Sequence, residues 1–131
     1  MKKFKGWFVM LLISLSLFGM TACSDNNANS YEQISPKEAK TIMDSQSDYI
    51  ILDVRTSEEF DEGHIADAVL LDYEDVRSKA HVVLPDKDAL ILVYCRSGRR
   101  SKIAAEELVK LGYTNIKEFG GIIDWPYEIV K

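Results

Sequence analysis

The chain has 131 residues, and its 16 Lys or Arg residues against 21 Asp or Glu residues give a formal net charge of −5 at pH 7. This length suits one ordinary domain. An acidic chain is poorly suited to bind nucleic acid or anionic lipid surfaces, so any anion site must come from a local cluster of positive charge.

The first 22 residues are typical of a secretory signal. Three lysines lie within the first five positions, and residues 7–20 are almost wholly apolar. This run is shorter than the about 20 apolar residues that span a bilayer, which favours a cleaved signal over the alternative, an uncleaved anchor helix. Loss of residues 1–22 leaves 13 basic residues against 21 acidic ones, a net charge of −8.

The segment MTAC at residues 20–23 resembles a bacterial lipobox, with Met20 where leucine is usual. The resemblance implies a lipoprotein signal peptide over residues 1–22 and lipidation of Cys23, palmitate included. Each buried acyl methylene contributes about 0.8 kcal/mol to membrane binding. We therefore expect an extracytoplasmic protein of the cell envelope that contacts the membrane through its lipid anchor only. Residues 23–30 form a polar tether, and residues 31–131 form the domain.

Capping signals predict several helices. Ser35-Pro36-Lys37-Glu38 opens the first helix with a capping box and a proline at its first position. Thr56-Ser57-Glu58-Glu59 is a second capping box, and its helix is expected to carry Phe60 inward and to end at Gly63. Residues 74–84 are predicted to be helical. A helix after residue 100 should end at Gly112 with an apolar face made by Ile103, Ala104, Leu108 and Leu111.

The continuous apolar run at residues 49–52 predicts a strand that is covered on both faces. Further strands are predicted at residues 68–73, 89–94 and 115–119, and the strand at 89–94 is the most hydrophobic and should be central. Residues 120–130 are expected to make a glycine turn and a short closing helix. Alternating strands and helices predict a single α/β domain with a mostly parallel central sheet and helices on both faces.

The segment VYCRSGRRSKIAAEE at residues 93–107 carries the strongest chemical signal. Ligands bind beyond the carboxyl ends of strands in open parallel sheets, and Cys95 stands at such an end. We expect residues 96–100 to form a loop whose backbone N–H groups point inward, before a helix N-terminus with partial positive charge. Gly98 allows a tight turn. Formal positive charge comes from Arg96, Arg99, Arg100 and Lys102.

These features favour the thiolate of Cys95, so Cys95 is a candidate nucleophile for a small anion or an electrophilic sulfur. If Cys23 is acylated, Cys95 is a lone thiol in an exported protein. Two plainer interpretations remain beside this one: a buried, inert cysteine and a solvated helix start for the arginines. The agreement among the loop features favours the nucleophile.

Three segments resemble single-domain rhodaneses, which are sulfurtransferases: LDVRTSEEFDEGHIADA at 52–68, VYCRSGRRS at 93–101 and FGGIIDW at 119–125. They occur in the family's order and at its spacing, and the resemblance covers residues 31–131. It implies a rhodanese-like domain with thiosulfate:cyanide sulfurtransferase activity and no cofactor.

The resemblance also implies a mechanism. Cys95 takes sulfur from thiosulfate or a protein persulfide, holds it as a persulfide cradled by N–H groups, and passes it to a thiol or to cyanide. The substrate-binding residues would be Arg96, Ser97, Gly98, Arg99 and Arg100. Asp53 and Arg55 would order the edge of the site.

Two other functions stay open. Some rhodanese-like domains are non-catalytic binding modules. Related folds with phosphatase or arsenate reductase activity place an arginine six positions after the cysteine, where this chain has Ser101. His64 and Trp125 are expected to be structural and Asp124 solvated or capping. Two distant histidines and one cysteine predict no metal site.

Overall fold

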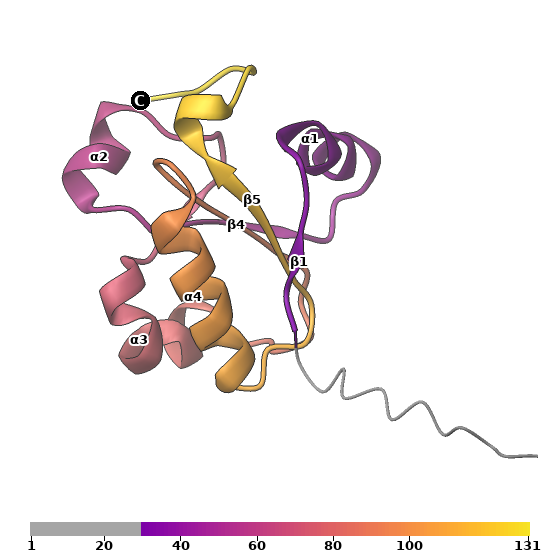
Figure 1. The fold of residues 1–131 in the computed structure, drawn as a ribbon, viewed down its shortest axis with the longest axis vertical. Helices are drawn as coiled ribbons and strands as arrows, with labels where there is room; N and C mark the ends of the chain where they lie inside the picture. The colour runs from indigo at the N-terminus through magenta and orange to yellow at the C-terminus, as the bar shows by residue number, and fades with distance from the viewer. Residues whose placement is uncertain (1–29) are drawn as a thin grey trace, which may run out of the picture.

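Five parallel strands form the centre of the computed structural model, which describes residues 30–131 (Figure 1). The strands are β1 (Glu32–Gln33), β2 (Ile50–Asp53), β3 (Val69–Leu70), β4 (Ile91–Cys95) and β5 (Ile116–Gly121). Their order across the sheet is β1-β5-β4-β2-β3, and every pairing is parallel. The hydrophobic strand β4 is central, as predicted.

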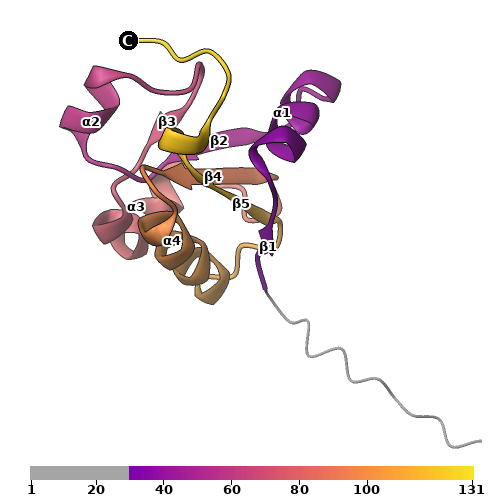
Figure 2. The same cartoon turned by 45° about the horizontal axis from the view of Figure 1, so that its top comes forward.

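Helices cover both faces of this sheet, so the predicted fold class is confirmed. They are α1 (Pro36–Ser45), α2 (Ser57–Glu62), α3 (Val76–Val83) and α4 (Arg99–Lys110), with 3-10 turns η1 (Tyr73–Asp75) and η2 (Ile122–Asp124). Figure 2 shows α3 and α4 on one side of the strands and α1 on the other. Within residues 30–131, no helix has the length and apolar character needed to cross a membrane.

The predicted signal peptide, Cys23 and all but the last residue of the predicted tether lie outside the described residues. The domain that follows begins at the sheet edge with β1.

Local capping explains where two helices begin. The Ser35 hydroxyl accepts from the Glu38 N–H at 3.1 Å, and the Glu38 carboxylate accepts from the Ser35 N–H at 2.7 Å. Thr56 caps α2 by accepting from the Glu59 N–H. The second capping box is incomplete, because the Glu59 carboxylate accepts from the Thr56 hydroxyl and from Arg100 instead.

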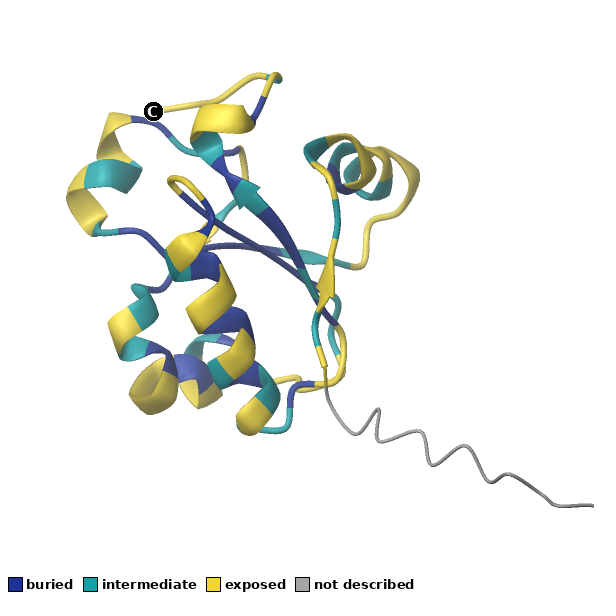
Figure 3. Cartoon of the chain, viewed as in Figure 1, coloured by how far each residue is buried: buried dark blue, intermediate teal, exposed yellow. Residues whose placement is uncertain are grey.

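The core has two halves, one on each face of the sheet (Figure 3). The half under α3 and α4 includes Val76, Ala80, Leu84, Ala104 and Leu108. The half under α1 includes Ala39, Leu92, Phe119 and Trp125. Every residue of β4 is buried, including Cys95 at its carboxyl end. The chain becomes exposed at Arg96 and Ser97, directly after the strand.

Three predicted details are wrong. The strand predicted over residues 68–73 is the two-residue edge strand β3, with Val69 38% exposed, because an edge strand pairs on one side only. Ile103 is 41% exposed, because the inward face of α4 is Ser101, Ala104, Ala105 and Leu108. The closing helix is the short turn η2, since Pro126 disfavours helical backbone at Trp125.

Candidate active site

Cys95 is the last residue of β4, a short turn before the N-terminus of α4. Only Arg96–Gly98 separate the two elements, so α4 begins within the predicted loop and Arg99 and Arg100 belong to its first turn. The Gly98 N–H donates to the Cys95 Sγ at 3.0 Å. The sulfur therefore lies at the positive end of the helix dipole. The residue is 1% exposed.

Two glycines make this turn possible. Gly98 has φ +104°, in the left-handed region that favours glycine. A Cβ on Gly121 would lie 1.9 Å from the Arg96 carbonyl oxygen, so no side chain fits there. A β-bulge in β5 brings Gly121 opposite Cys95, while Glu118 lies opposite Val93. The end of β5 thus lies directly against the Cys95 turn.

The three arginines of the turn have different surroundings. Arg96 and Arg99 are exposed, and the Arg99 guanidinium lies 5.9 Å from the centre of the Tyr73 ring. Arg100 binds the Glu59 carboxylate with two hydrogen bonds, at 2.7 and 2.9 Å. Hydrogen bonding from Arg100 lowers the pKa of Glu59 to about 2. Arg96 and Arg99 are therefore the arginines of this turn that face solvent, and Ser97 is exposed beside them.

Sequence reasoning missed two residues beside the sulfur, Ser101 and Glu118. Ser101 is fully buried, and its Oγ lies 3.4 Å from the Cys95 Sγ. The Glu118 carboxylate, 3% exposed, accepts from the Ser101 hydroxyl at 2.6 Å and from the Gly120 N–H at 2.8 Å. A signal was available in the sequence. Glu118 lies two positions after the buried Ile116 in β5, so it shares the face of Ile116 and points into the core.

Asp53 and Arg55 form a buried network at the end of β2. Arg55 Nη2 donates to Asp53 at 2.7 Å and to the Gly63 carbonyl at 2.7 Å. The Tyr94 hydroxyl donates to Asp53 at 2.6 Å and accepts from the Ile65 N–H at 3.1 Å. Burial of the Tyr94 hydroxyl raises its pKa, and the negative charge of Asp53 raises it further. The network holds the segment at 63–65 against the strand that ends in Cys95.

His64 has structural contacts. Its Nδ1 lies 2.9 Å from the Phe60 carbonyl oxygen, and its ring stacks on the Phe60 ring with centres 3.7 Å apart. Its backbone pairs with Val130 in an isolated bridge. Among residues 30–131, no three His, Cys, Asp or Glu side chains gather in a way that could hold a metal ion.

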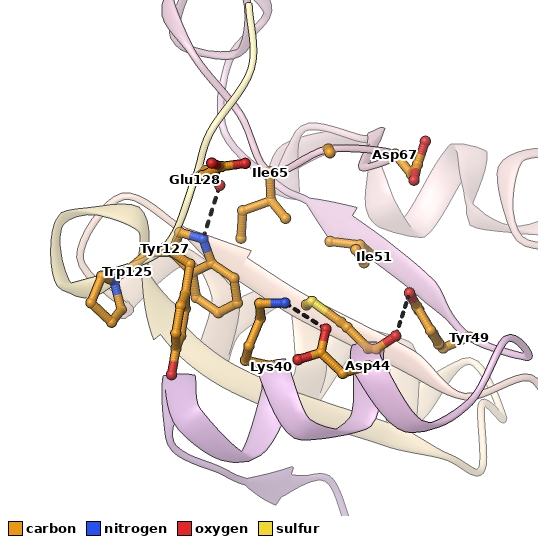
Figure 4. A pocket seen from close by; sticks show the side chains of 12 residues that line it. Lys40, Asp44, Tyr49, Ile51, Ile65, Asp67, Trp125, Tyr127 and Glu128 are labelled. Carbon is orange, nitrogen blue, oxygen red and sulfur yellow. Dashed lines mark hydrogen bonds and ion pairs between the residues drawn. The ribbon is translucent and has the colours of Figure 1, made fainter.

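A hollow of about 690 Å³ lies apart from Cys95, between α1 and the C-terminal segment (Figure 4). Trp125 and Tyr127 line it on one side. Lys40 and Asp44, one turn apart on α1, also line it and form an ion pair with each other. No residue of the Cys95 turn is among its lining residues. Trp125, 9% exposed, belongs to the core and to the wall of this hollow.

A comparison with models of known protein families shows to which family this chain belongs. The model of the rhodanese-like domain matches residues 35–126, which contain the Cys95 turn, Ser101 and Glu118. The chain belongs to the rhodanese-like domain family. Its rhodanese domain is 34% identical over 80 residues to the thiosulfate sulfurtransferase PspE of Escherichia coli, covering 61% of this chain and 77% of that protein.

Two further comparisons agree. The chain is 32% identical over 104 residues to the adenylyltransferase and sulfurtransferase UBA4 of Candida albicans, but it spans only 24% of that protein's length. The solved structure of a rhodanese with anions from Escherichia coli superposes with a TM-score of 0.60 at 32% identity, covering 63% of this chain and 98% of that one. These relatives support a sulfurtransferase family.

Proposed function

We propose that this rhodanese domain is a sulfurtransferase that carries a sulfane sulfur on Cys95. The main support is the geometry at the sulfur. The Cys95 Sγ accepts from the Gly98 N–H at 3.0 Å, at the N-terminus of α4. The first turn of a helix has N–H groups without partners inside the helix. Such donors stabilise negative charge that develops on a bound sulfur.

The reaction has two steps. The Cys95 thiolate attacks the outer sulfur of thiosulfate, a new S–S bond forms, and the donor's own S–S bond breaks as sulfite leaves with the electron pair. An acceptor thiolate or cyanide then attacks the outer sulfur of the Cys95 persulfide, and Cys95 leaves as a thiolate. Neither step needs a metal ion or an organic cofactor.

The surroundings of Cys95 support roles for its neighbours. Exposed Arg96 and Arg99 attract the anionic donor, whereas Arg100, bound to Glu59, holds the first turn of α4 in place. The backbone N–H of Gly98 binds the sulfur directly. Because Cys95 is 1% exposed, a small donor such as thiosulfate or a polysulfide reaches it more readily than a protein persulfide does.

The proposal is tested by intact mass. The full-length chain, purified in detergent, is incubated with thiosulfate beside Cys95→Ser and Cys23→Ser. We expect a gain of one sulfur atom in the wild type and in Cys23→Ser, its loss on addition of cyanide, and no gain in Cys95→Ser. No gain in the wild type with thiosulfate or polysulfide would leave a non-catalytic binding module as the better interpretation.

The chemistry at Ser101 argues against the phosphatase alternative. That alternative requires an arginine at this position, six residues after the cysteine, to bind the oxyanion. Ser101 is instead fully buried and hydrogen bonded to Glu118, so no arginine side chain occupies this position to bind a phosphate.

We further propose that Cys23 is lipidated and holds the domain at the cell envelope, outside the cytoplasm. The lipobox-like segment at residues 20–23 supports this proposal. Cys23→Ser should move the protein to the soluble fraction or block its processing, as measured by membrane fractionation. Unchanged membrane attachment of a processed Cys23→Ser chain would show that lipid does not anchor it.

A further inference from the structure

A chain of hydrogen bonds links the nucleophile to a buried carboxylate. The Cys95 S–H donates to the Ser101 Oγ at 3.4 Å, and the Ser101 O–H donates to the Glu118 Oε1 at 2.6 Å. We propose that Cys95, Ser101 and Glu118 form a proton relay, in which Glu118 takes the proton that Cys95 loses. This inference rests on the proposed function for its role in sulfur transfer.

The single hydrogen of the Ser101 hydroxyl sets the direction of the relay. Its Oγ lies near four polar partners, but one hydrogen serves one acceptor. The carboxylate of Glu118 is the nearest of them, and charge-assisted bonds are the strong ones. A hydroxyl that donates to Glu118 turns its lone pairs toward Cys95, where they receive the S–H. Deprotonation of Cys95 requires this hydroxyl to reverse.

Transfer of the proton is balanced at each atom. The Cys95 S–H bond breaks as Ser101 Oγ gains that proton, and the former Ser101 proton passes to Glu118 Oε1. The product is a Cys95 thiolate that accepts from Ser101, which in turn accepts from a neutral Glu118. Cys95 and Glu118 together hold one negative charge before and after the transfer, so the transfer itself does not place two anions across one hydroxyl.

The surroundings favour negative charge at the sulfur end. The Gly98 N–H, the N-terminus of α4 and the charge of Arg100 all act on Cys95. At the other end, Glu118 is 3% exposed and forms no ion pair with any residue that the structure describes. The relay thus joins a sulfur that faces positive charge to a carboxylate that has no cationic partner among the described residues.

Other charged groups near the relay are already paired or peripheral. Glu59 of α2 is bound to Arg100, and Asp72, after β3, contributes a more distant charge near the same arginine. On the sheet side, β4 places the apolar Val93 opposite Glu118, and β1 places the neutral Gln33 there. Ser101 contacts the reacting sulfur directly, whereas Glu118 is a positioning residue that acts through Ser101.

The test is a titration of thiolate by its ultraviolet absorbance, from about pH 4 to about pH 10. The full-length chain is measured in detergent, and the spectrum of Cys95→Ser is subtracted so that tyrosines and Cys23 cancel. The relay predicts two steps in the wild type, because the remaining proton of the pair is shared between Glu118 and Cys95 after the first ionisation. Part of the thiolate therefore forms on the first ionisation, and the rest forms when both groups are ionised. Glu118→Gln and Ser101→Ala should each show one step.

The control is Glu107→Gln, which removes a carboxylate of α4 that pairs with Arg77 at 2.6 Å, and it should keep the two steps. A single step in the wild type overturns the relay, whether or not the variants fold. A two-step curve that persists in folded Ser101→Ala also overturns it. The titration uses no sulfur donor, so failure of the relay and failure of sulfur transfer from thiosulfate are seen separately.

Discussion

Asp53 and Arg55 form a charged pair that is almost fully enclosed, with exposed fractions of 0% and 5%. Such a pair adds little stability compared with a well-packed apolar pair, because both charges lose their hydration on burial. Removal of one partner is costly, however, because it leaves the other charge buried. The pair also supports the Tyr94 hydroxyl and the Gly63 carbonyl, so its effect reaches the segment next to the site.

Arg55→Ala should therefore lower the free energy of unfolding by about 3–5 kcal/mol, the range for a broken buried pair. Urea unfolding followed by circular dichroism measures this change. Arg77→Ala is the matched control, because Arg77 also pairs with a carboxylate but its side chain is 78% exposed, and it should change stability little. An equal loss of unfolding free energy in both variants would contradict the prediction that burial makes the pair of Asp53 and Arg55 costly to break.

At the scale of elements, the bond between Glu59 and Arg100 ties α2 to the first turn of α4. The two side chains are 26% and 17% exposed, so solvent screens the pair only in part. Hydrogen bonding from Arg100 lowers the pKa of Glu59 from 4.5 to about 2. A lowered folded-state pKa stabilises the fold above the unfolded value, and this contribution disappears as the pH falls through the folded value.

The difference in stability between the wild type and Glu59→Gln should thus be full, at about 1 kcal/mol, above pH 5. It should shrink as the pH falls from about 4.5 toward about 2. Urea unfolding of both proteins across this range gives the difference, in which the other carboxylates cancel. A difference that stays constant down to pH 2, or that grows, would show that the pair does not stabilise the fold in this way.

For the molecule as a whole, the parallel sheet brings the carboxyl ends of its strands to one edge, where the candidate site lies. The carboxyl ends of β2, β4 and β5 supply Asp53, Cys95 and Gly121 to the same region, and α4 begins directly above it. The chain is acidic overall, with a net charge of −5. Charges beyond about 8 Å are screened at physiological salt. Exposed Arg96 and Arg99 would therefore dominate the local charge that the proposed anionic donor meets near Cys95.

The sequence by itself determined the α/β class, the central place of the strand ending in Cys95, the caps at Ser35 and Thr56, and the family. The class and the caps follow from apolar runs and capping residues, which act within a few residues along the chain, and the family follows from three motifs at 52–68, 93–101 and 119–125 that can be read directly from the sequence. Element ends were less predictable. The edge position that shortens β3 and the packing that leaves Ile103 exposed depend on neighbours distant in sequence.

Only the tertiary structure decided what surrounds the sulfur. Ser101 and Glu118 are 17 positions apart, and a helix turn and a bulged strand bring them together. The structure also assigned Arg100 to Glu59, 41 positions away, and left Arg96 and Arg99 exposed. A run of arginines looks uniform in sequence, because the direction of each side chain is set by the elements packed against it.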